Sequence, residues 1–257
     1  MQVNDDIMVL ASCGHHPLSG RERRADRDAQ ALEIALQHTA SPHVVFAGDP
    51  ECSALREYLG MGVPEVNVLI QTAESDVSAA LASYAHQKSP RVVLCGHRAE
   101  QGESSGMVPY LVGKRLNAAV VPDVVDILAQ DAESVEVLQA LAGGQRRRLH
   151  VRLPAVLIAS ASAPVARQSA FTKARDGVIH SLSVADVEDT ELITWHWQAA
   201  KKRAKRVKTV AASSSSRDRF RAATAASAST GGKVLQNPSP EEAADAIMQL
   251  LKEKGVY

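Results

Sequence analysis

Cysteine is scarce in this chain, and the three cysteines it has lie far apart. Cys13, Cys52 and Cys95 are the only ones among 257 residues, and no two of them form a C-x-x-C pair. An odd number of cysteines at wide spacing argues against a disulfide framework and against a zinc ribbon. We therefore expect neither a disulfide framework nor a zinc ribbon.

Aromatic residues and long apolar runs are also scarce. Aromatic side chains make up 4% of the chain, too few to build a surface on which bases stack. No run of about 18 apolar residues exists, so we expect no transmembrane helix and a protein that is not embedded in a membrane. The first six residues are acidic and lack the basic and then apolar layout of a secretion signal, so we expect a cytoplasmic location.

The net charge of zero conceals one strongly basic segment. Residues 201–221 hold nine Lys or Arg against one acidic residue, Asp218, a net charge of +8, so the rest of the chain carries −8. Such a block is typical of a solvated linker, of a strip that meets an acidic partner, or of a nucleic-acid arm. It has one aromatic residue, Phe220, and no recognition motif, so we expect no nucleic-acid partner.

The first 160 residues alternate short apolar runs with helical patterns. Strands separated by helices predict parallel βαβ units, and strands that are apolar throughout predict a sheet covered on both faces. The fold class is therefore α/β, a doubly wound, mostly parallel sheet. Strands are expected at Ile7–Ala11, His43–Ala47, Val66–Ile70, Arg91–Cys95, Val120–Leu128, Val135–Leu138 and Val156–Ala159. Helices are expected at Asp26–His38, Glu51–Leu59, Asp76–Gln87 and Met107–Leu116.

The regular alternation ends after Ser160, and the C-terminal part has a different composition. We expect a domain of residues 1–190, followed by a basic and Ala/Ser-rich arm of residues 191–257. The arm ends in a predicted helix, Ala243–Lys254, that Ser239 and Glu242 begin as a capping box and Gly255 ends. A helix beyond such a linker needs a surface to dock on, in its own domain or in a partner chain.

One loop carries groups suited to an anion. Residues 96–106, Gly-His-Arg-Ala-Glu-Gln-Gly-Glu-Ser-Ser-Gly, follow a predicted buried strand and open a helix. Hydroxyl, amide and backbone N–H donors at a helix N-terminus suit phosphate, although the loop is neither G-x-G-x-x-G nor a Walker sequence. Together with the carboxyl ends of the neighbouring strands, the predicted cofactor-binding residues are Leu10, Ala11, Ser12, Ala47, Gly48, Gly96, Gln101, Gly102, Glu103, Ser104, Ser105 and Gly106.

No catalytic constellation is recognisable. His15 and His16 are adjacent in a loop with only Cys13 nearby, which is more typical of a solvated pair than of a metal site. No G-x-S-x-G nucleophile elbow is present. We expect a binding protein, with no catalytic residue and no metal.

Five motifs in order resemble the β subunits of electron transfer flavoproteins. Each motif is soft alone, but their shared order is specific, and the similarity extends from about Ile7 to Arg175 and again over the last helix. The matching segments are Asp28–Leu36, Leu55–Gly62, Arg91–Gly96, Gly143–Gly144 with Leu153–Val156, and the final stretch that begins SPEEAADAIMQLLKEKG.

The resemblance implies a heterodimer with a larger α subunit that holds most of a redox-active FAD. The β subunit supplies a wall beside the FAD, has an adenine-nucleotide α-hydrolase-like fold and usually binds AMP, for which Ser104 and Ser105 would be phosphate donors. Electrons would pass from a flavin dehydrogenase to a membrane quinone pool through a quinone oxidoreductase of the electron transfer flavoprotein. The residues that would dock on partners are Phe171, Lys173, Arg175, Ile247, Leu250 and Leu251.

This sequence departs from the family pattern in three places. Ala25-Asp26-Arg27 replaces Asn-Pro-Phe before the first helix, and the nucleotide loop is two residues shorter. The segment Arg167–Arg175, where the family recognises dehydrogenases, is also shorter and offers Phe171 as its apolar anchor. The departures indicate a divergent branch that serves a dedicated catabolic dehydrogenase. The alternative is a stand-alone adenine-nucleotide-binding α/β protein of the universal-stress type, which predicts a homo-oligomer without flavin.

Overall fold

The structure is a computed structural model, in which residues 7–196, 198–200, 215–217, 235–253 and 255 are described. The chain divides into two units, residues 1–195 and residues 196–257. Most of the basic block at 201–221 and of the Ala/Ser-rich stretch lies outside the described residues.

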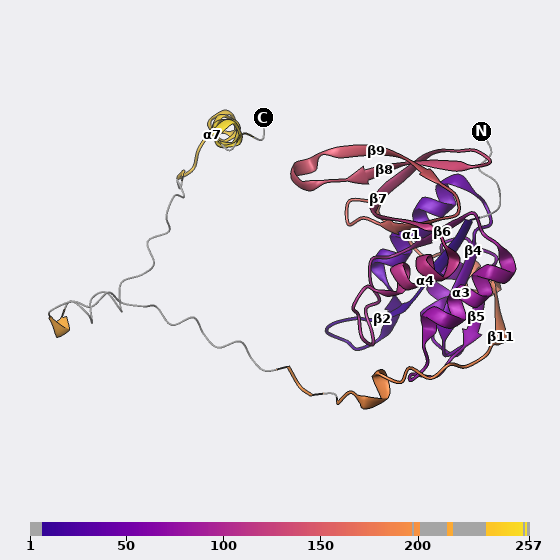
Figure 1. Cartoon of the computed structure of the whole chain (residues 1–257). Helices are drawn as coiled ribbons and strands as arrows, with labels where there is room; N and C mark the ends of the chain where they lie inside the picture. Colours follow the sequence, from indigo (N-terminus) through magenta and orange to yellow (C-terminus); the bar gives the residue numbers. More distant parts are fainter. Residues whose placement is uncertain (1–6, 197, 201–214, 218–234, 254, 256–257) are drawn as a thin grey trace. The chain divides into compact units, whose positions relative to one another are not determined.

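The first unit is built on a nine-stranded sheet in the order β11-β5-β4-β1-β6-β10-β7-β8-β9 (Figure 1). The chain begins in the middle of the sheet and winds outward in both directions. Six strands and the start of β7 are parallel, while β7, β8 and β9 form an antiparallel meander at one end. The strands are β1 (Ile7–Ala11), β4 (His43–Gly48), β5 (Glu65–Ile70), β6 (Val92–Cys95), β7 (Ala119–Gln130), β8 (Ser134–Ala140), β9 (Arg146–Arg152), β10 (Ala155–Ala159) and β11 (Val178–Ser183).

Helices cover both faces of the parallel sheet, which confirms the predicted fold class. Alternate residues of β1 belong to different cores: Ile7 and Val9 pack with α1 (Asp26–His38) and α2 (Leu55–Gly60). Met8 and Leu10 pack instead with α3 (Val77–Lys88) and α4 (Val108–Leu116). All five β1 residues are buried, as expected for a central parallel strand.

Several elements differ from the sequence predictions. The run Arg146–Arg148 opens β9, and β11 lies beyond the end of the predicted alternation; both are edge strands, whose solvated sides lack an apolar pattern. The helix expected from Glu51 begins only at Leu55. The remaining short elements are the ribbon strands β2 (Cys13–His15) and β3 (Glu22–Arg24), the helix α5 (Phe171–Asp176) and the 3₁₀ turns η1 (Ala142–Gly144) and η2 (Leu192–Thr194).

The sequence argument against a disulfide framework did not anticipate a single disulfide. Cys13 and Cys52 are joined by a disulfide across 39 residues of chain. Because β1 and β4 are neighbouring parallel strands, the segments that follow them meet at the same edge of the sheet, and sequence spacing does not reveal this proximity. Cys95 is free and buried.

The segment after β10 packs along α1 and α2. The backbone N–H of Ala170 donates to Gly60 O at 2.9 Å, and a Cβ at Gly60 would overlap the side chain of Ser169. Arg56 of α2 donates to the carbonyls of Ala174 and Gly177 at 3.2 and 2.9 Å. Gly60 and Arg56 of α2 therefore provide the contacts that hold α5 against this helix.

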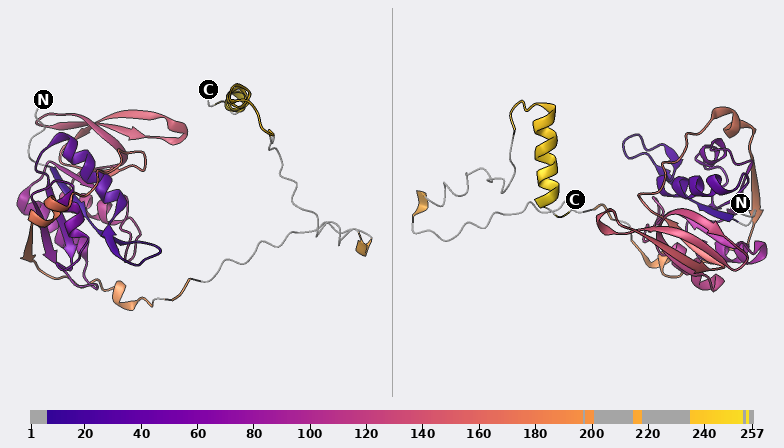
Figure 2. Two further views of the ribbon diagram at one scale, coloured as in Figure 1. Left: turned by 180° about the vertical axis from the view of Figure 1, so that it is seen from behind. Right: turned by 90° about the horizontal axis from the view of Figure 1, so that it is seen from above.

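The second unit contains α7 (Pro240–Glu253), which Figure 2 shows from the side as a regular helix. Its capping box is as predicted: Ser239 N donates to Glu242 Oε2 at 2.9 Å, and Glu242 N donates to Ser239 Oγ at 3.2 Å. Gly255 has a positive φ of 66°, as a residue that ends a helix requires. Among the described residues, no helix has the length and apolarity needed to cross a membrane.

Candidate functional site

The predicted residues at the strand ends lie along one edge of the sheet. β4, β1 and β6 are adjacent and parallel, and their registers pair Ala11 with Phe46 and Leu10 with Cys95. The carboxyl ends that carry Leu10–Ser12, Ala47–Gly48 and Gly96 therefore meet. A Cβ at Gly96 would overlap the side chains of Asp28 and Arg27, so glycine is needed there because α1 approaches closely.

Asp28 connects these strand ends, and sequence reasoning missed it. Its carboxylate accepts a hydrogen bond from Ser12 Oγ, and it accepts one from Gly96 N at 2.8 Å. Burial raises the pKa of the Asp28 carboxyl to about 6, although both hydrogen bonds favour the ionised form. Asp28 thereby fixes the start of α1 against β1 and β6.

Tyr58 of α2 supports the same junction. Its hydroxyl donates to Ser12 O at 2.7 Å and accepts from Ala25 N at 3.0 Å. The side chain is fully buried, so both ends of its hydroxyl are satisfied without water. Ala25, the residue before α1, has no side chain that could cap the helix. The hydroxyl of Tyr58 therefore binds its backbone instead.

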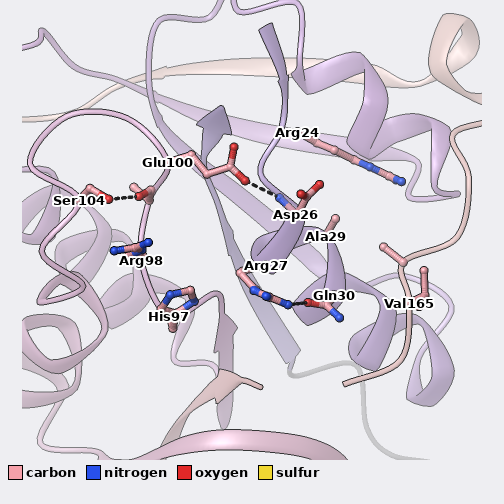
Figure 3. Close-up of a pocket in the computed structure, with 12 residues that line it drawn as sticks. Arg24, Asp26, Arg27, Ala29, Gln30, His97, Arg98, Glu100, Ser104 and Val165 are labelled. Atoms are coloured by element: carbon pink, nitrogen blue, oxygen red, sulfur yellow. Dashed lines mark hydrogen bonds between the residues drawn. The ribbon is translucent and has the colours of Figure 1, made fainter. Parts of the chain in front are cut away.

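A pocket of about 630 Å³ opens beside this junction (Figure 3). His97 and Arg98 lie on one side, Arg24 and Val165 lie on the other, and the first turn of α1 lies between them. The lining residues come from β3, α1, the loop after β6 and the segment after β10: Arg24, Asp26, Arg27, Ala29, Gln30, His97, Arg98, Ala99, Glu100, Ser104, Val165 and Ala166.

Of the residues predicted to bind the cofactor, only Ser104 of the phosphate loop lines the pocket. The Ser104 hydroxyl donates to Ala99 O at 2.7 Å, and Ser105 Oγ accepts from Met107 N at 3.3 Å. Gly106 has a φ of 78°, and a Cβ there would lie 2.8 Å from His97 O. In the free chain the two serines thus hold the loop together, and their role toward phosphate stays a prediction.

Glu100 fills the position at the start of α1 that an external anion would occupy. Its carboxylate accepts from Asp26 N at 3.0 Å and from Arg23 at 2.8 Å. Arg23 also pairs with Asp26 at 2.5 Å. The carboxylate stabilises the positive end of α1, and both acids of the pocket are paired with Arg23.

The arginines of the pocket have no such partners among the described residues. Nη1 of Arg24 is buried without a hydrogen-bond partner there, and Arg27 donates to Gln30 Oε1 at 2.6 Å. Desolvation, Arg98 and Arg27 together hold the pKa of His97 below its ordinary value, so its ring is neutral at pH 7. Three arginines, Arg24, Arg27 and Arg98, therefore line the pocket without an ion-pair partner among the described residues, a lining that favours an anionic ligand group.

The predicted docking residues are exposed in the described parts of the chain. Phe171 is 80% exposed, and Lys173 and Arg175 of the same helix face solvent. Ile247 and Leu250 of α7 are 59% and 53% exposed, while Leu251 is half-buried. Large apolar side chains are rarely this exposed on a helix whose apolar face is packed against a partner.

Of the two adjacent histidines, His16 has a local structural role. Nδ1 of His16 accepts from Leu18 N and Ser19 N, at 3.3 and 3.2 Å, and so orders the turn between β2 and β3. Within the described residues, no three His, Cys, Asp or Glu side chains are grouped so that they could hold a metal ion.

The doubly wound, mostly parallel sheet, with a pocket at its carboxyl edge, places this molecule in the Rossmann-like class of α/β proteins. A family model described as the electron transfer flavoprotein domain matches residues 23–187. The electron transfer flavoprotein subunit beta of Chromohalobacter salexigens is 43% identical to this chain over an alignment of 257 residues. The alignment covers 98% of this chain and 95% of that protein. The chain belongs to the electron transfer flavoprotein family, in the line of its beta subunits.

Proposed function

We propose that this chain is the β subunit of a heterodimer whose larger α subunit holds most of the FAD. The observation that carries the proposal is the 43% identity to a beta subunit, which extends over 98% of the chain and so includes the C-terminal arm. In this account the heterodimer accepts electrons from a flavin dehydrogenase and passes them, through its quinone oxidoreductase, to the membrane quinone pool. FAD supplies the reversible uptake of electrons.

The role of this chain toward FAD is to form a wall rather than to perform acid–base chemistry. The half-buried Arg24 and Arg27, which line the pocket, favour contact with a negatively charged part of the cofactor. Asp28, Ser12 and Gly96 hold the backbone beneath that wall in place. We infer that the subunit carries electrons and has no catalytic residue of its own.

AMP is the second nucleotide that we propose for this subunit, in the loop of residues 101–106. Binding would require the Ser104 hydroxyl to exchange its bond to Ala99 O for a phosphate oxygen, whereas the Ser105 hydroxyl accepts from Met107 N and can still donate its own proton. Ser105→Glu places a carboxylate against the phosphate, and we expect the AMP extracted from the purified complex to fall to background. Ser183→Glu, at the exposed end of β11, is the control. Undiminished AMP in the Ser105 variant would reassign the loop.

The partner contacts are proposed for two exposed segments. We infer that α5, which carries Phe171, Lys173 and Arg175, meets the donor dehydrogenase, and that the arm with α7 meets the α subunit. A donor dedicated to one catabolic pathway is consistent with the short segment at Arg167–Arg175.

The heterodimer is tested by co-expression with the α subunit and by measuring the mass of the purified species in solution. One copy of each chain per particle is the expected result. A chain that purifies alone as a homo-oligomer would instead favour the stand-alone nucleotide-binding protein, and the family resemblance would then report the fold alone.

A further inference from the structure

The disulfide between Cys13 and Cys52 fastens the ribbon of β2 and β3 to the segment before α2. Cys13 begins β2, shortly after the central strand β1, and Cys52 lies three residues before α2 begins. Both cysteines belong to the core that also contains residues of α1 and α2, yet each keeps 8% of its surface exposed. The bond therefore lies at the boundary between core and solvent, where a thiolate can reach it after a small local opening.

The ribbon is too small to stay in place by its own pairing. β2 and β3 are three residues each, with Cys13 opposite Arg24, and an isolated two-stranded ribbon is at best marginally stable. Its remaining bonds to the α2 region are not covalent. Glu22 accepts from Ser53 N and Ser53 Oγ, both at 2.8 Å, and Arg24 N donates to Glu57 Oε2 at 3.2 Å. Without the disulfide, the ribbon therefore keeps these contacts but opens more often.

The ribbon also lies against the loop of residues 96–106. A Cβ at Gly14 of β2 would overlap the carboxylate of Glu100, and Arg23 of β3 pairs with the same carboxylate at 2.8 Å. Arg24, the next residue of β3, lines the pocket. An opening of the ribbon therefore removes two contacts of Glu100 and moves one side of the pocket.

We propose that the Cys13–Cys52 disulfide is a reversible redox tether, whose reduction by a dithiol loosens the ribbon and, through Glu100, the loop of residues 96–106. One thiolate of the dithiol attacks a sulfur of the pair, so that the S–S bond breaks and a mixed disulfide forms. The second thiolate then closes the disulfide of the reductant and releases the other cysteine. Two electrons pass to the cysteine pair, and its sulfurs take up two protons. A disulfide oxidant such as oxidised glutathione takes them back and restores the bond.

The third cysteine does not compete in this exchange. Cys95 is free and buried, and burial, together with the nearby Asp28, raises the pKa of its thiol. Because the thiolate is the reactive form, Cys95 stays inert. In the cytoplasm, the compartment that the sequence favours for this chain, a disulfide is typically transient or redox-sensing rather than structural. The tether thus has the chemistry of a sensor of the thiol state.

One consequence of the tether rests on the proposed function. The loosened loop is the one proposed to hold AMP, so reduction should weaken AMP binding. The loosening of the ribbon and of the loop does not depend on any nucleotide.

The test follows hydrogen exchange of the full-length chain by mass spectrometry, after reduction with dithiothreitol and after reoxidation with oxidised glutathione. We expect reduction to expose two reactive thiols and to make peptides from 13–24 and 96–106 exchange about tenfold faster, while peptides of β8 stay unchanged. Reoxidation should reverse both effects. Cys13→Ser with Cys52→Ser should exchange fast under both conditions, and the control Cys95→Ala should keep the wild-type response.

Two results would overturn the proposal: two reactive thiols that oxidised glutathione does not remove, or equal exchange of the ribbon in both states. The wild-type comparison needs no substitution, so it decides the matter even if the double serine variant does not fold. Loosened segments together with unchanged AMP in the reduced complex would instead remove AMP from this loop and leave the tether standing.

Discussion

The carboxylate of Glu33, in α1, accepts two hydrogen bonds from the guanidinium of Arg167, at 2.7 and 2.9 Å. The same carboxylate also accepts from Arg167 N at 3.1 Å. Both residues lie outside the pocket, but the pair fixes the segment after β10, which lines the pocket through Val165 and Ala166. The geometry of the site thus depends on an ion pair between residues 134 positions apart.

The first prediction concerns this pair. Glu33→Gln leaves one carbonyl oxygen where two charged oxygens accepted bonds, so we expect the free energy of unfolding to fall by about 2 kcal/mol. Arg167 lowers the pKa of Glu33, so this stability is present above the ordinary carboxyl pKa and is lost as the pH falls. Urea titration at pH 7 measures the change. Glu136→Gln breaks the exposed pair with Arg148 and should cost well under 1 kcal/mol; an equal loss in both variants would contradict the account.

The second prediction concerns the buried Asp28. Its pKa is raised to about 6 by burial, so the folded state binds a proton that the unfolded state releases between about pH 4 and pH 6. Stability from this group is therefore present at low pH and is lost as the pH rises to 6. Asp28→Asn does not titrate, and relative to it the wild type should lose about 3 kcal/mol over that range.

Urea unfolding at pH 4, 5, 6 and 7 measures the Asp28 effect. The matched control is Asp186→Asn, because Asp186 is exposed, and its curve should run parallel to that of the wild type. Parallel wild-type and Asp28→Asn curves would show that the carboxyl titrates as if it were in water.

The third prediction concerns the contacts that hold α5 against α2. Arg56 satisfies two carbonyls at the end of this helix, so Arg56→Ala should make local opening of α5 about tenfold more frequent. Trypsin cleavage after Lys173 and Arg175, followed by mass spectrometry, reports that opening. Arg146→Ala, in the edge strand β9, is the control. Cleavage at the wild-type rate would mean that packing alone holds α5.

The fourth prediction concerns α7. If Ile247 and Leu250, both exposed in the chain by itself, become buried against the α subunit, then Ile247→Asp with Leu250→Asp should weaken heterodimer formation at least tenfold. Gln249→Asp, on the opposite side of the helix, should leave it unchanged. Calorimetric titration of the two subunits measures both, and equal affinities for the two variants would argue against docking by this face.

The fold could be predicted from sequence wherever burial on both faces requires an apolar pattern. The helix Asp26–His38 and the strand Ile7–Ala11 lie at the predicted bounds. The edge strands were missed because half of each is solvated, and Arg146–Arg148 even carries three charges. The antiparallel end of the sheet is therefore evident only from the pairing of β7, β8 and β9.

The site was harder to predict, because its contacts join distant parts of the chain. Gly96 and Ser12 were predicted as cofactor-binding residues from their places at strand ends, and that role stays a prediction. Asp28, which joins them, looks like an ordinary helix residue 16 and 68 positions away. Arg24 lies in a short ribbon that has no periodic signal. The disulfide between Cys13 and Cys52 was missed for the same reason.

The most direct test of the electron-carrier function is the visible absorbance spectrum of the purified complex between this chain and its α subunit, with the FAD released by denaturation quantified against protein. We expect the spectrum of oxidised flavin, one FAD per heterodimer, and bleaching when a reduced flavin dehydrogenase is added without oxygen. A colourless complex, or flavin that no such dehydrogenase reduces, would contradict the electron-carrier function.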